Sequence, residues 1–203
     1  MSKPLLLVGC GGHARALIDV VESGKKWQIW GLVGTPEEVG WRVFNYPVLG
    51  SNWDLPKLRE KCPNALLAIG QIGASVHRHR LAKQLKDLDF TIPILISNHA
   101  VISRHAKIGS GTTVGHGAIV NGGAQVGNHC ILNSRALVEH DVLIGDFCHI
   151  STGALVNGGV KIGDGSFIGS GAMLREGLEL PPNTVISAGK RIMGWPIQEG
   201  KVQ

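Results

Sequence analysis

The sequence of 203 residues has few charged side chains, few aromatic residues and no long apolar run. Charged residues make up 17% and aromatic residues 5% of the chain, whereas 43% of it is hydrophobic and 29 residues are glycine. A disordered chain has low hydrophobicity and high charge, so this composition favours a compact, turn-rich β protein. No apolar stretch reaches the ~18 residues that a membrane helix needs, so we expect no membrane insertion.

The start of the chain lacks the features of a secretory signal. Its apolar stretch, "PLLLVGCGG", is too short, and only Lys3 charges the residues before it. We interpret it as a buried first strand and expect a cytoplasmic protein.

Cysteine is scarce and has no metal-binding pattern. The four cysteines form no C-x-x-C pair and no zinc spacing, which indicates free thiols in a reducing compartment and predicts no metal site. The formal charge is +5 and the pI about 9.2. Because the basic residues are scattered and aromatic residues are few, we expect no nucleic acid partner. A phosphate-rich small ligand explains the charge balance equally well.

Residues 1–95 read as alternating strands and helices. The stretches "PLLLVG", "WQIWGLVG", "NALLAIG" and "FTIPILI" are strand candidates, and "YPVLGSNWDL" reads as turns. Helical spacing is present in "ARALIDVVESG", "DLPKLREKC" and "SVHRHRLAKQLKDL". This alternation predicts a small Rossmann-like α/β domain with a parallel sheet over residues 1–95.

From residue 102 every sixth residue is aliphatic, without insertion or deletion up to residue 186. Four residues after nearly every one of these comes a small or modest side chain. This is the hexapeptide repeat of a parallel β-helix, in which three hexads close one coil and coils stack ~4.8 Å apart. It predicts an all-β domain over residues 96–203, with Cys130 and Cys148 as stacked core thiols in equivalent interior positions.

Two motifs give the chain a family resemblance. The hexad array follows an α/β domain that starts with "VGCGGHA", and the array itself contains "LNSRALVEHDVLIGDFCHIS". Together they resemble the sugar O- and N-acyltransferases of bacterial surface-glycan and sialic-acid pathways, including N-acetyltransferases of nucleotide-activated amino sugars. The resemblance implies a left-handed β-helix, a homotrimer with active sites between subunits, and acetyl-CoA as co-substrate. It also implies a catalytic pattern made of Asn133, Glu139, His140, Asp141 and His149.

The triplet "EHD" at residues 139–141 interrupts turns that elsewhere contain glycine, asparagine and serine. Such local inconsistency is expected at functional sites. His140 has the chemistry of a general base, and either Asp141 or Glu139 orients its ring. Gly158, 18 residues later, lies on the next coil, where its backbone N–H is a candidate oxyanion donor. The triplet alone fits a solvated corner histidine equally well, and the matching offsets of the other family positions favour catalysis.

The resemblance assigns further positions to acetyl-CoA. His149 matches the position that helps to hold the acetyl carbonyl, and Arg191 is a candidate for the coenzyme phosphates. The remaining matches lie in the later coils, at Ser170, Ala188 and Gly189.

The turn "GCGGHA" fits G-x-G-x-x-G/A between a strand and a helix, a pattern that brings phosphate to a helix N-terminus. Gly34 and Thr35 stand where a dinucleotide site has an acidic residue, which disfavours NAD. The resemblance implies instead that the turn binds the nucleotide of a sugar substrate, although a turn that only packs helix on strand fits as well. The substrate positions that carry over are Gly9, Gly11, Gly12, His13, Gly70 and Gln71.

The sequence therefore predicts an acetyl-CoA-dependent acetyltransferase that modifies the amino group of a nucleotide-activated amino sugar. Two alternatives stay open. One is an O-acetyltransferase acting on sialic acid or a related sugar, and the other is a non-catalytic β-helix that binds a ligand or a metal.

Overall fold

The structure, a computed structural model, describes residues 2–73 and 75–196 and divides into two compact units. Unit 1 comprises Met1–Gly70 and Val76–Asn98, and unit 2 comprises Gln71–Ser75 and His99–Gln203. None of the helices in the described ranges is long and apolar enough to cross a membrane.

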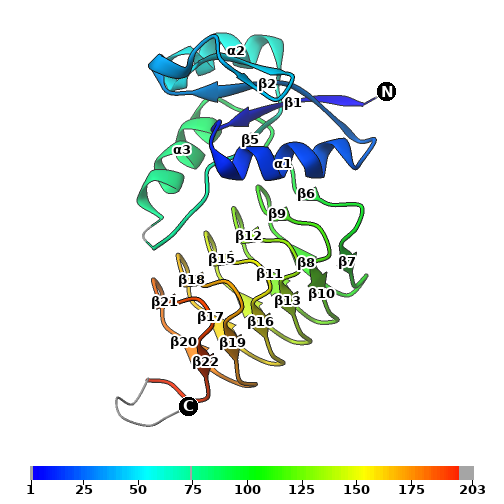
Figure 1. Cartoon of the computed structure of the whole chain (residues 1–203), viewed down its shortest axis with the longest axis vertical. Helices are drawn as coiled ribbons and strands as arrows, with labels where there is room; N and C mark the ends of the chain where they lie inside the picture. The colour runs from blue at the N-terminus through cyan, green and yellow to red at the C-terminus, as the bar shows by residue number, and fades with distance from the viewer. Residues whose placement is uncertain (1, 74, 197–203) are drawn as a thin grey trace. The chain divides into compact units, whose positions relative to one another are not determined.

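Unit 1 is an α/β domain built on one sheet (Figure 1). The strands lie in the order β3 (Arg42–Val43), β4 (Tyr46–Ser51), β2 (Trp27–Gly34), β1 (Lys3–Val8) and β5 (Ala65–Leu67). All neighbouring pairs are parallel except β3 with β4. The remaining elements are the helices α1 (Gly12–Glu22), α2 (Leu55–Lys61) and α3 (Val76–Asp87), the 3-10 turns η1 (Pro36–Glu38) and η2 (Asn52–Asp54), and the short strand β6 (Leu95–Ile96).

The predicted α/β fold is confirmed, but two of its segments differ from the prediction. The stretch "FTIPILI" forms only β6, which is not part of the five-stranded sheet of unit 1. The stretch "YPVLGSNWDL" contains β4 rather than only turns. Pro47 and Gly50 suggested turns, but Pro47 faces the two-residue strand at the sheet edge, where a missing N–H donor is tolerated.

The strand order determines where unit 1 can bind a ligand. From β1 the chain continues to β2 and β4 on one side of the sheet and later returns to β5 on the other. In such sheets ligands bind beyond the carboxyl ends of the strands, at this reversal of strand order. The glycine turn that follows β1 lies at this point.

Unit 2 is a β-helix of two-residue strands in three parallel sheets (Figure 1). Each strand pairs with the strand 18 residues later, as Leu137 does with Leu155, which confirms three hexads per coil. The apolar sheet contains β7 (Val101–Ile102), β10 (Ile119–Val120), β13 (Leu137–Val138), β16 (Leu155–Val156), β19 (Met173–Leu174) and β22 (Arg191–Ile192). The polar sheet contains β8 (Lys107–Ile108), β11 (Gln125–Val126), β14 (Leu143–Ile144), β17 (Lys161–Ile162) and β20 (Glu179–Leu180). The third sheet contains β9 (Thr113–Val114), β12 (Ile131–Leu132), β15 (His149–Ile150), β18 (Phe167–Ile168) and β21 (Val185–Ile186).

The interior of the β-helix is filled by the residues that the hexad pattern selected. The aliphatic positions from Val114 to Ile186 are buried, and Ile102 and Ile108 at the first coils are partly buried against the same core. Cys130 and Cys148 are buried free thiols, as predicted. Their Sγ atoms donate to the carbonyls of Gly145 and Gly163, at 3.0 and 3.2 Å, so both thiols bond to the neighbouring turns.

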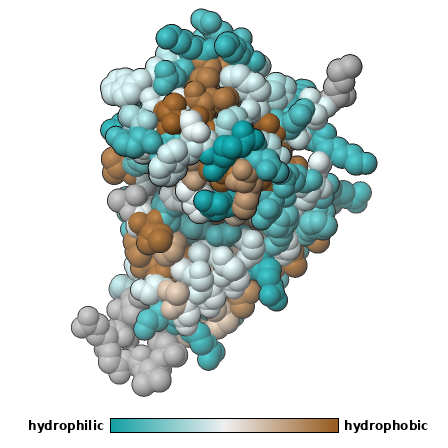
Figure 2. Space-filling model, turned by 45° about the horizontal axis from the view of Figure 1, so that its top comes forward, coloured by the Kyte–Doolittle hydropathy of each residue, from teal (hydrophilic) through white to brown (hydrophobic). Residues whose placement is uncertain are grey.

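The outer faces of the apolar and polar sheets differ in chemistry, and the two sheets are named after this difference. The outward residues of the apolar sheet are Val101, Ile119, Leu137, Leu155 and Met173, followed by Arg191. Those of the polar sheet are Lys107, Gln125, Leu143, Lys161 and Glu179, of which the last two form an exposed ion pair at 2.6 Å. The face of the protein in Figure 2 shows hydrophobic residues in separate groups among hydrophilic and neutral ones.

Candidate active site

His140 occupies a corner of the β-helix, between β13 of the apolar sheet and β14 of the polar sheet. Its side chain is 68% exposed, so the imidazole stands outside the coils rather than in the aliphatic core. The turn carries the side chains of Glu139, His140 and Asp141 in a row, and Asp141 adopts the left-handed conformation, with φ 59°. Aspartate is one of the few residues other than glycine that tolerate this region.

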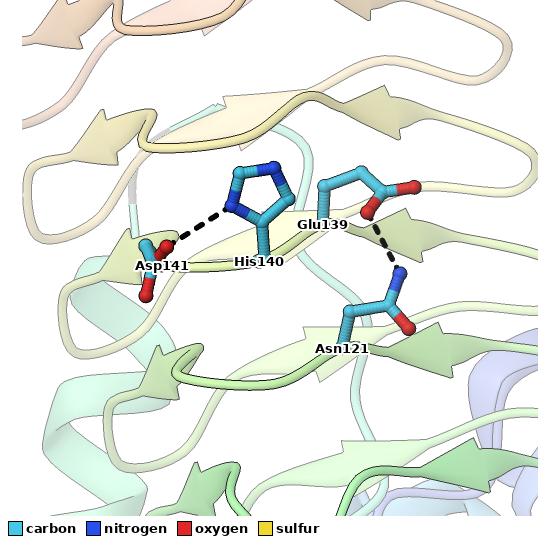
Figure 3. Close-up of polar contacts among 4 residues, drawn as sticks. All are labelled: Asn121, Glu139, His140 and Asp141. Carbon is cyan, nitrogen blue, oxygen red and sulfur yellow. Dashed lines mark hydrogen bonds and ion pairs between the residues drawn. The ribbon is translucent and has the colours of Figure 1, made fainter.

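The structure distinguishes the two carboxylates that flank the imidazole (Figure 3). Nδ1 of His140 lies 3.0 Å from Oδ2 of Asp141. Glu139 lies on the other side of the ring and accepts a hydrogen bond of 2.8 Å from the side-chain amide of Asn121, one coil earlier. Asp141 is therefore the carboxylate in contact with the ring, a choice that the sequence left open.

This contact decides which ring nitrogen is free to act as a base. An ionised carboxylate only accepts hydrogen bonds, so Nδ1 must carry the hydrogen. In the neutral imidazole Nε2 then has the lone pair. The pair of His140 and Asp141 has the arrangement of a base held in one tautomer by a carboxylate.

Two glycines on the neighbouring coils leave room for this pair. A Cβ at Gly158 would lie 2.6 Å from Nε2 and 2.7 Å from Cε1 of His140, so the missing side chain makes space for the imidazole itself. A Cβ at Gly123, on the preceding coil, would collide with the carboxylate of Asp141. The neighbouring coils thus have no side chain at the places that the imidazole and the carboxylate occupy.

Other predicted positions lie at a different corner of the same chain. Asn133 follows β12, at the corner between the third sheet and the apolar sheet, and its Oδ1 accepts from the N–H of Ser134 at 2.8 Å. Ser170 lies two coils further along this corner and shares a hydrogen bond of 2.9 Å with Ser151. The exposed residues Ala188 and Gly189 follow one coil later. Within one chain, this corner and that of His140 are at opposite ends of the strands of the apolar sheet, and Arg191 lies exposed on the last of these strands.

His149 and Gln71 meet each other on the third sheet. His149 is 7% exposed, and its Nδ1 lies 2.7 Å from the backbone oxygen of Gln71. The side-chain amide of Gln71 donates to the carbonyls of Phe147 and Gly165, on successive coils, at 2.9 and 3.2 Å. Gln71, expected to bind substrate, is therefore bonded to two coils of the β-helix, and His149 contacts Gln71 rather than His140.

In unit 1 the glycine turn brings its predicted residues together. Gly9, with φ 127°, closely approaches the end of β5, where a Cβ would be 2.6 Å from Ile69 Cγ2. Gly11 is the N-cap of α1, and no side chain caps this helix. The turn opens into a cavity of about 370 Å³. His13, in the first turn of α1, lies close to Gly70, whose Cβ would be 3.7 Å from that of His13.

Sequence reasoning missed one feature of this cavity. Glu38, at the end of η1, folds its carboxylate back over the end of β2, where Oε2 accepts from the N–H of Thr35 at 2.8 Å. The thiol of Cys10 also bonds to this carboxylate, which lowers the pKa of Glu38, while burial and the Glu38 carboxylate raise the pKa of Cys10 to about 12. The signal in the sequence was the capping pattern "TPEE", in which Thr35 is the N-cap.

The described residues contain no group of three or more histidine, cysteine, aspartate or glutamate side chains that could hold a metal ion.

Both units match known families. Residues 4–85 match the PglD N-terminal domain, and residues 141–176 match the bacterial transferase hexapeptide (six repeats). No curated protein matches the chain by sequence.

Several solved structures are similar over nearly the whole chain. A His-to-Asn mutant of perosamine N-acetyltransferase from Caulobacter crescentus, in complex with CoA and GDP-perosamine, has a TM-score of 0.88 and 28% identity, covering 94% of this chain and 89% of that one. The acetyltransferase domain of PglB from Neisseria gonorrhoeae FA1090 has a TM-score of 0.86 and 28% identity, covering 98% and 95%. The same domain in complex with acetyl coenzyme A has a TM-score of 0.84 and 28% identity, covering 95% and 93%.

Proposed function

Because this chain joins a PglD-type N-terminal domain to a bacterial transferase hexapeptide repeat, we propose that it is an acetyl-CoA-dependent N-acetyltransferase acting on a nucleotide-activated amino sugar. The observation that carries this proposal is the contact of 3.0 Å between His140 Nδ1 and Asp141 Oδ2 on an exposed corner of the β-helix. The relatives that were solved with CoA and GDP-perosamine or with acetyl coenzyme A supply the substrate class.

The chemistry is direct acyl transfer. Nε2 of His140 takes a proton from the sugar amine as the amine nitrogen attacks the thioester carbonyl, and Asp141 stabilises the imidazolium that forms. The tetrahedral intermediate then expels the coenzyme thiolate, which receives the proton from the imidazolium. A thioester is already activated, so no acyl-enzyme is needed. The backbone N–H of Gly158 is our candidate donor to the oxyanion.

A second copy of the chain is part of the proposal. Asn133, Ser170, Ala188 and Gly189 lie one corner away from His140 in the same chain. A homotrimer that packs through the apolar sheet would bring the corner of Asn133 in one copy toward His140 in another. The outward stripe from Val101 to Met173 supplies the apolar surface for such packing.

The test is an acetylation assay with purified protein, labelled acetyl-CoA and a panel of GDP-, UDP- and CMP-linked sugars that carry either a free amine or only hydroxyls. We expect transfer to an amino sugar and a loss of transfer in His140→Ala. Transfer to hydroxyls alone would replace the proposal by the O-acetyltransferase alternative. Full activity in His140→Ala would refute the role of this residue as the base.

A further inference from the structure

The end of β2 carries a carboxylate that the local sequence does not suggest. Gly34 and Thr35 end this strand without an acidic side chain, yet Glu38 places its Oε2 there, 2.8 Å from the N–H of Thr35. The absence of a side chain at Gly34 makes this possible, because a Cβ there would lie 2.8 Å from Glu38 Oε2 and 2.9 Å from Cys10 Sγ. In nucleotide-binding sheets of this strand order, an acidic residue at this position binds the ribose hydroxyls.

The carboxylate faces a cavity of suitable composition. The cavity of about 370 Å³ is bordered by the ends of β1, β2 and β4 and by α3, and its lining includes Gly11, Glu38, Asn52, Trp53 and Arg80. A carboxylate has about four acceptor positions. The N–H and the hydroxyl of Thr35 and the thiol of Cys10 bond to this carboxylate, which leaves an acceptor position for a ribose hydroxyl.

The ends of three adjacent strands offer neighbouring positions for the phosphates, the ribose and the base of a nucleotide. β1, β2 and β4 are adjacent in the sheet, so their ends span about 10 Å. The uncapped N-terminus of α1, which follows β1, is suited to phosphate. Glu38 lies at the end of β2. Trp53, in the turn that follows β4, is 86% exposed and offers an indole face on which a base can stack.

We propose that Glu38 accepts a hydrogen bond from the 2′- or 3′-hydroxyl of the ribose in the nucleotide part of the substrate, with the base stacked on Trp53 and the phosphates at the N-terminus of α1. This deepens the proposed function and rests on it, because the nucleotide-activated sugar supplies the ribose. Glu38 thereby replaces the strand-end acidic residue that is missing at positions 34 and 35.

The test measures binding of GDP and UDP, and of their 2′,3′-dideoxy forms, by isothermal titration calorimetry. Wild-type protein is expected to bind the ribonucleotides more tightly than the dideoxy forms. Glu38→Gln keeps the size and capping ability of the side chain but removes its charge. We expect it to weaken ribonucleotide binding by about tenfold or more and to leave dideoxy binding unchanged. Glu37→Gln, a neighbour on η1 outside the cavity lining, is the matched control with no expected effect.

Stacking on Trp53 is tested separately. Trp53→Ala should weaken the ribo and dideoxy forms alike, and Trp53→Phe should restore much of the binding. Circular dichroism melting of each variant establishes that the fold is intact. Three results would overturn the ribose site: unchanged ribonucleotide binding by Glu38→Gln, equal binding of ribo and dideoxy forms by the wild type, or no binding of either nucleoside diphosphate. Equal binding by Trp53→Ala and the wild type would overturn the stacking.

The outcome is separable from that of the proposed function. If the nucleotides bind as expected but no amino sugar is acetylated, the acetyltransferase proposal fails and the ribose site stands. If a nucleotide amino sugar is acetylated with the same KM by Glu38→Gln and the wild type, the ribose site fails and the acetyltransferase proposal stands.

Discussion

The imidazole of His140 lies against Gly158, the glycine at the same position one coil later. The ring atoms Nε2, Cε1 and Cδ2 all lie within 3.3 Å of the place where a Cβ of residue 158 would be. The two backbones are also joined, because the N–H of Gly159 donates to the carbonyl of His140 at 3.0 Å. The imidazole can take this position because the adjacent coil has no side chain there.

This relationship predicts that Gly158→Ala displaces the imidazole. Gly158 does not have a positive φ, so alanine fits its backbone and only the contact with His140 changes. Misplacing a catalytic group by about 1 Å can cost 10²-fold in rate, and we expect a loss of kcat of about that size in the acetylation assay.

Gly122→Ala is the matched control, because it occupies the same position one coil before His140. A Cβ there would come no closer than 3.7 Å to any neighbour, the Oγ of Ser103. We expect near wild-type kcat and melting temperature. If Gly158→Ala kept the activity of Gly122→Ala, the imidazole position seen here would not matter for catalysis.

The second prediction concerns Asp141, the carboxylate that contacts the proposed base. Asp141→Asn should lower kcat by about 10²-fold or more, because an amide can present its NH₂ to Nδ1 and favour the wrong tautomer. Asparagine tolerates the left-handed backbone at this position, so the melting temperature should hardly change.

The control for this substitution is Glu139→Gln, which alters the carboxylate that bonds to Asn121 rather than to His140. We expect little effect on kcat. A large loss in Glu139→Gln together with normal activity in Asp141→Asn would reverse the assignment of the two carboxylates.

The hexad positions could be predicted from the sequence because a parallel coil repeats the same environment every 18 residues. One strict aliphatic period therefore determined the core from Val114 to Ile186. The α/β domain was less readable, since proline and glycine in "YPVLGSNWDL" suggested turns where the edge of the sheet accommodates a strand.

The candidate site could be predicted only in part. The sequence indicated His140 because the other turns of the repeat contain mostly glycine, asparagine and serine, and charged residues there suggest a functional site. It offered no means of choosing between the neighbours of His140, Glu139 and Asp141. That choice depends on the left-handed backbone of Asp141 and on Asn121, 18 residues before Glu139. The sequence placed Glu38 too far beyond the end of β2, because its carboxylate returns to this strand end through a 3-10 turn, a path that residue spacing does not reveal.

The third prediction tests the proposed packing of copies through the apolar sheet. Leu155→Lys places a charge in the middle of the outward apolar stripe, where a subunit contact would leave it desolvated and unpaired. We expect a shift toward monomers in light scattering with size-exclusion chromatography, and a loss of activity.

Leu143→Lys is the control for this substitution. Leu143 and Leu155 have almost the same exposure, 39% and 37%, but Leu143 lies on the polar sheet. It should leave the assembly unchanged. A wild-type protein that is monomeric at micromolar concentration would contradict the trimer itself, and dissociation by Leu143→Lys alone would place the contact on the other sheet.

The fourth prediction concerns Gln71, which bonds to two successive coils. Gln71→Ala removes the donors to the carbonyls of Phe147 and Gly165, and it empties a site that is only 5% exposed. Losing partners for buried carbonyls costs about 1–3 kcal/mol, so we expect a lower midpoint in urea unfolding and faster proteolysis in the segment from residue 71 to residue 75. Ile72→Ala, which changes a side chain that is 86% exposed, should alter the unfolding free energy by no more than about 0.5 kcal/mol. His149 bonds to the backbone oxygen of Gln71, so Gln71→Ala does not remove this bond directly. A change of kcat in Gln71→Ala would therefore indicate that the side-chain bonds of Gln71 to the β-helix matter for catalysis. Equal stability of the two variants would show that the amide does not anchor this segment to the β-helix.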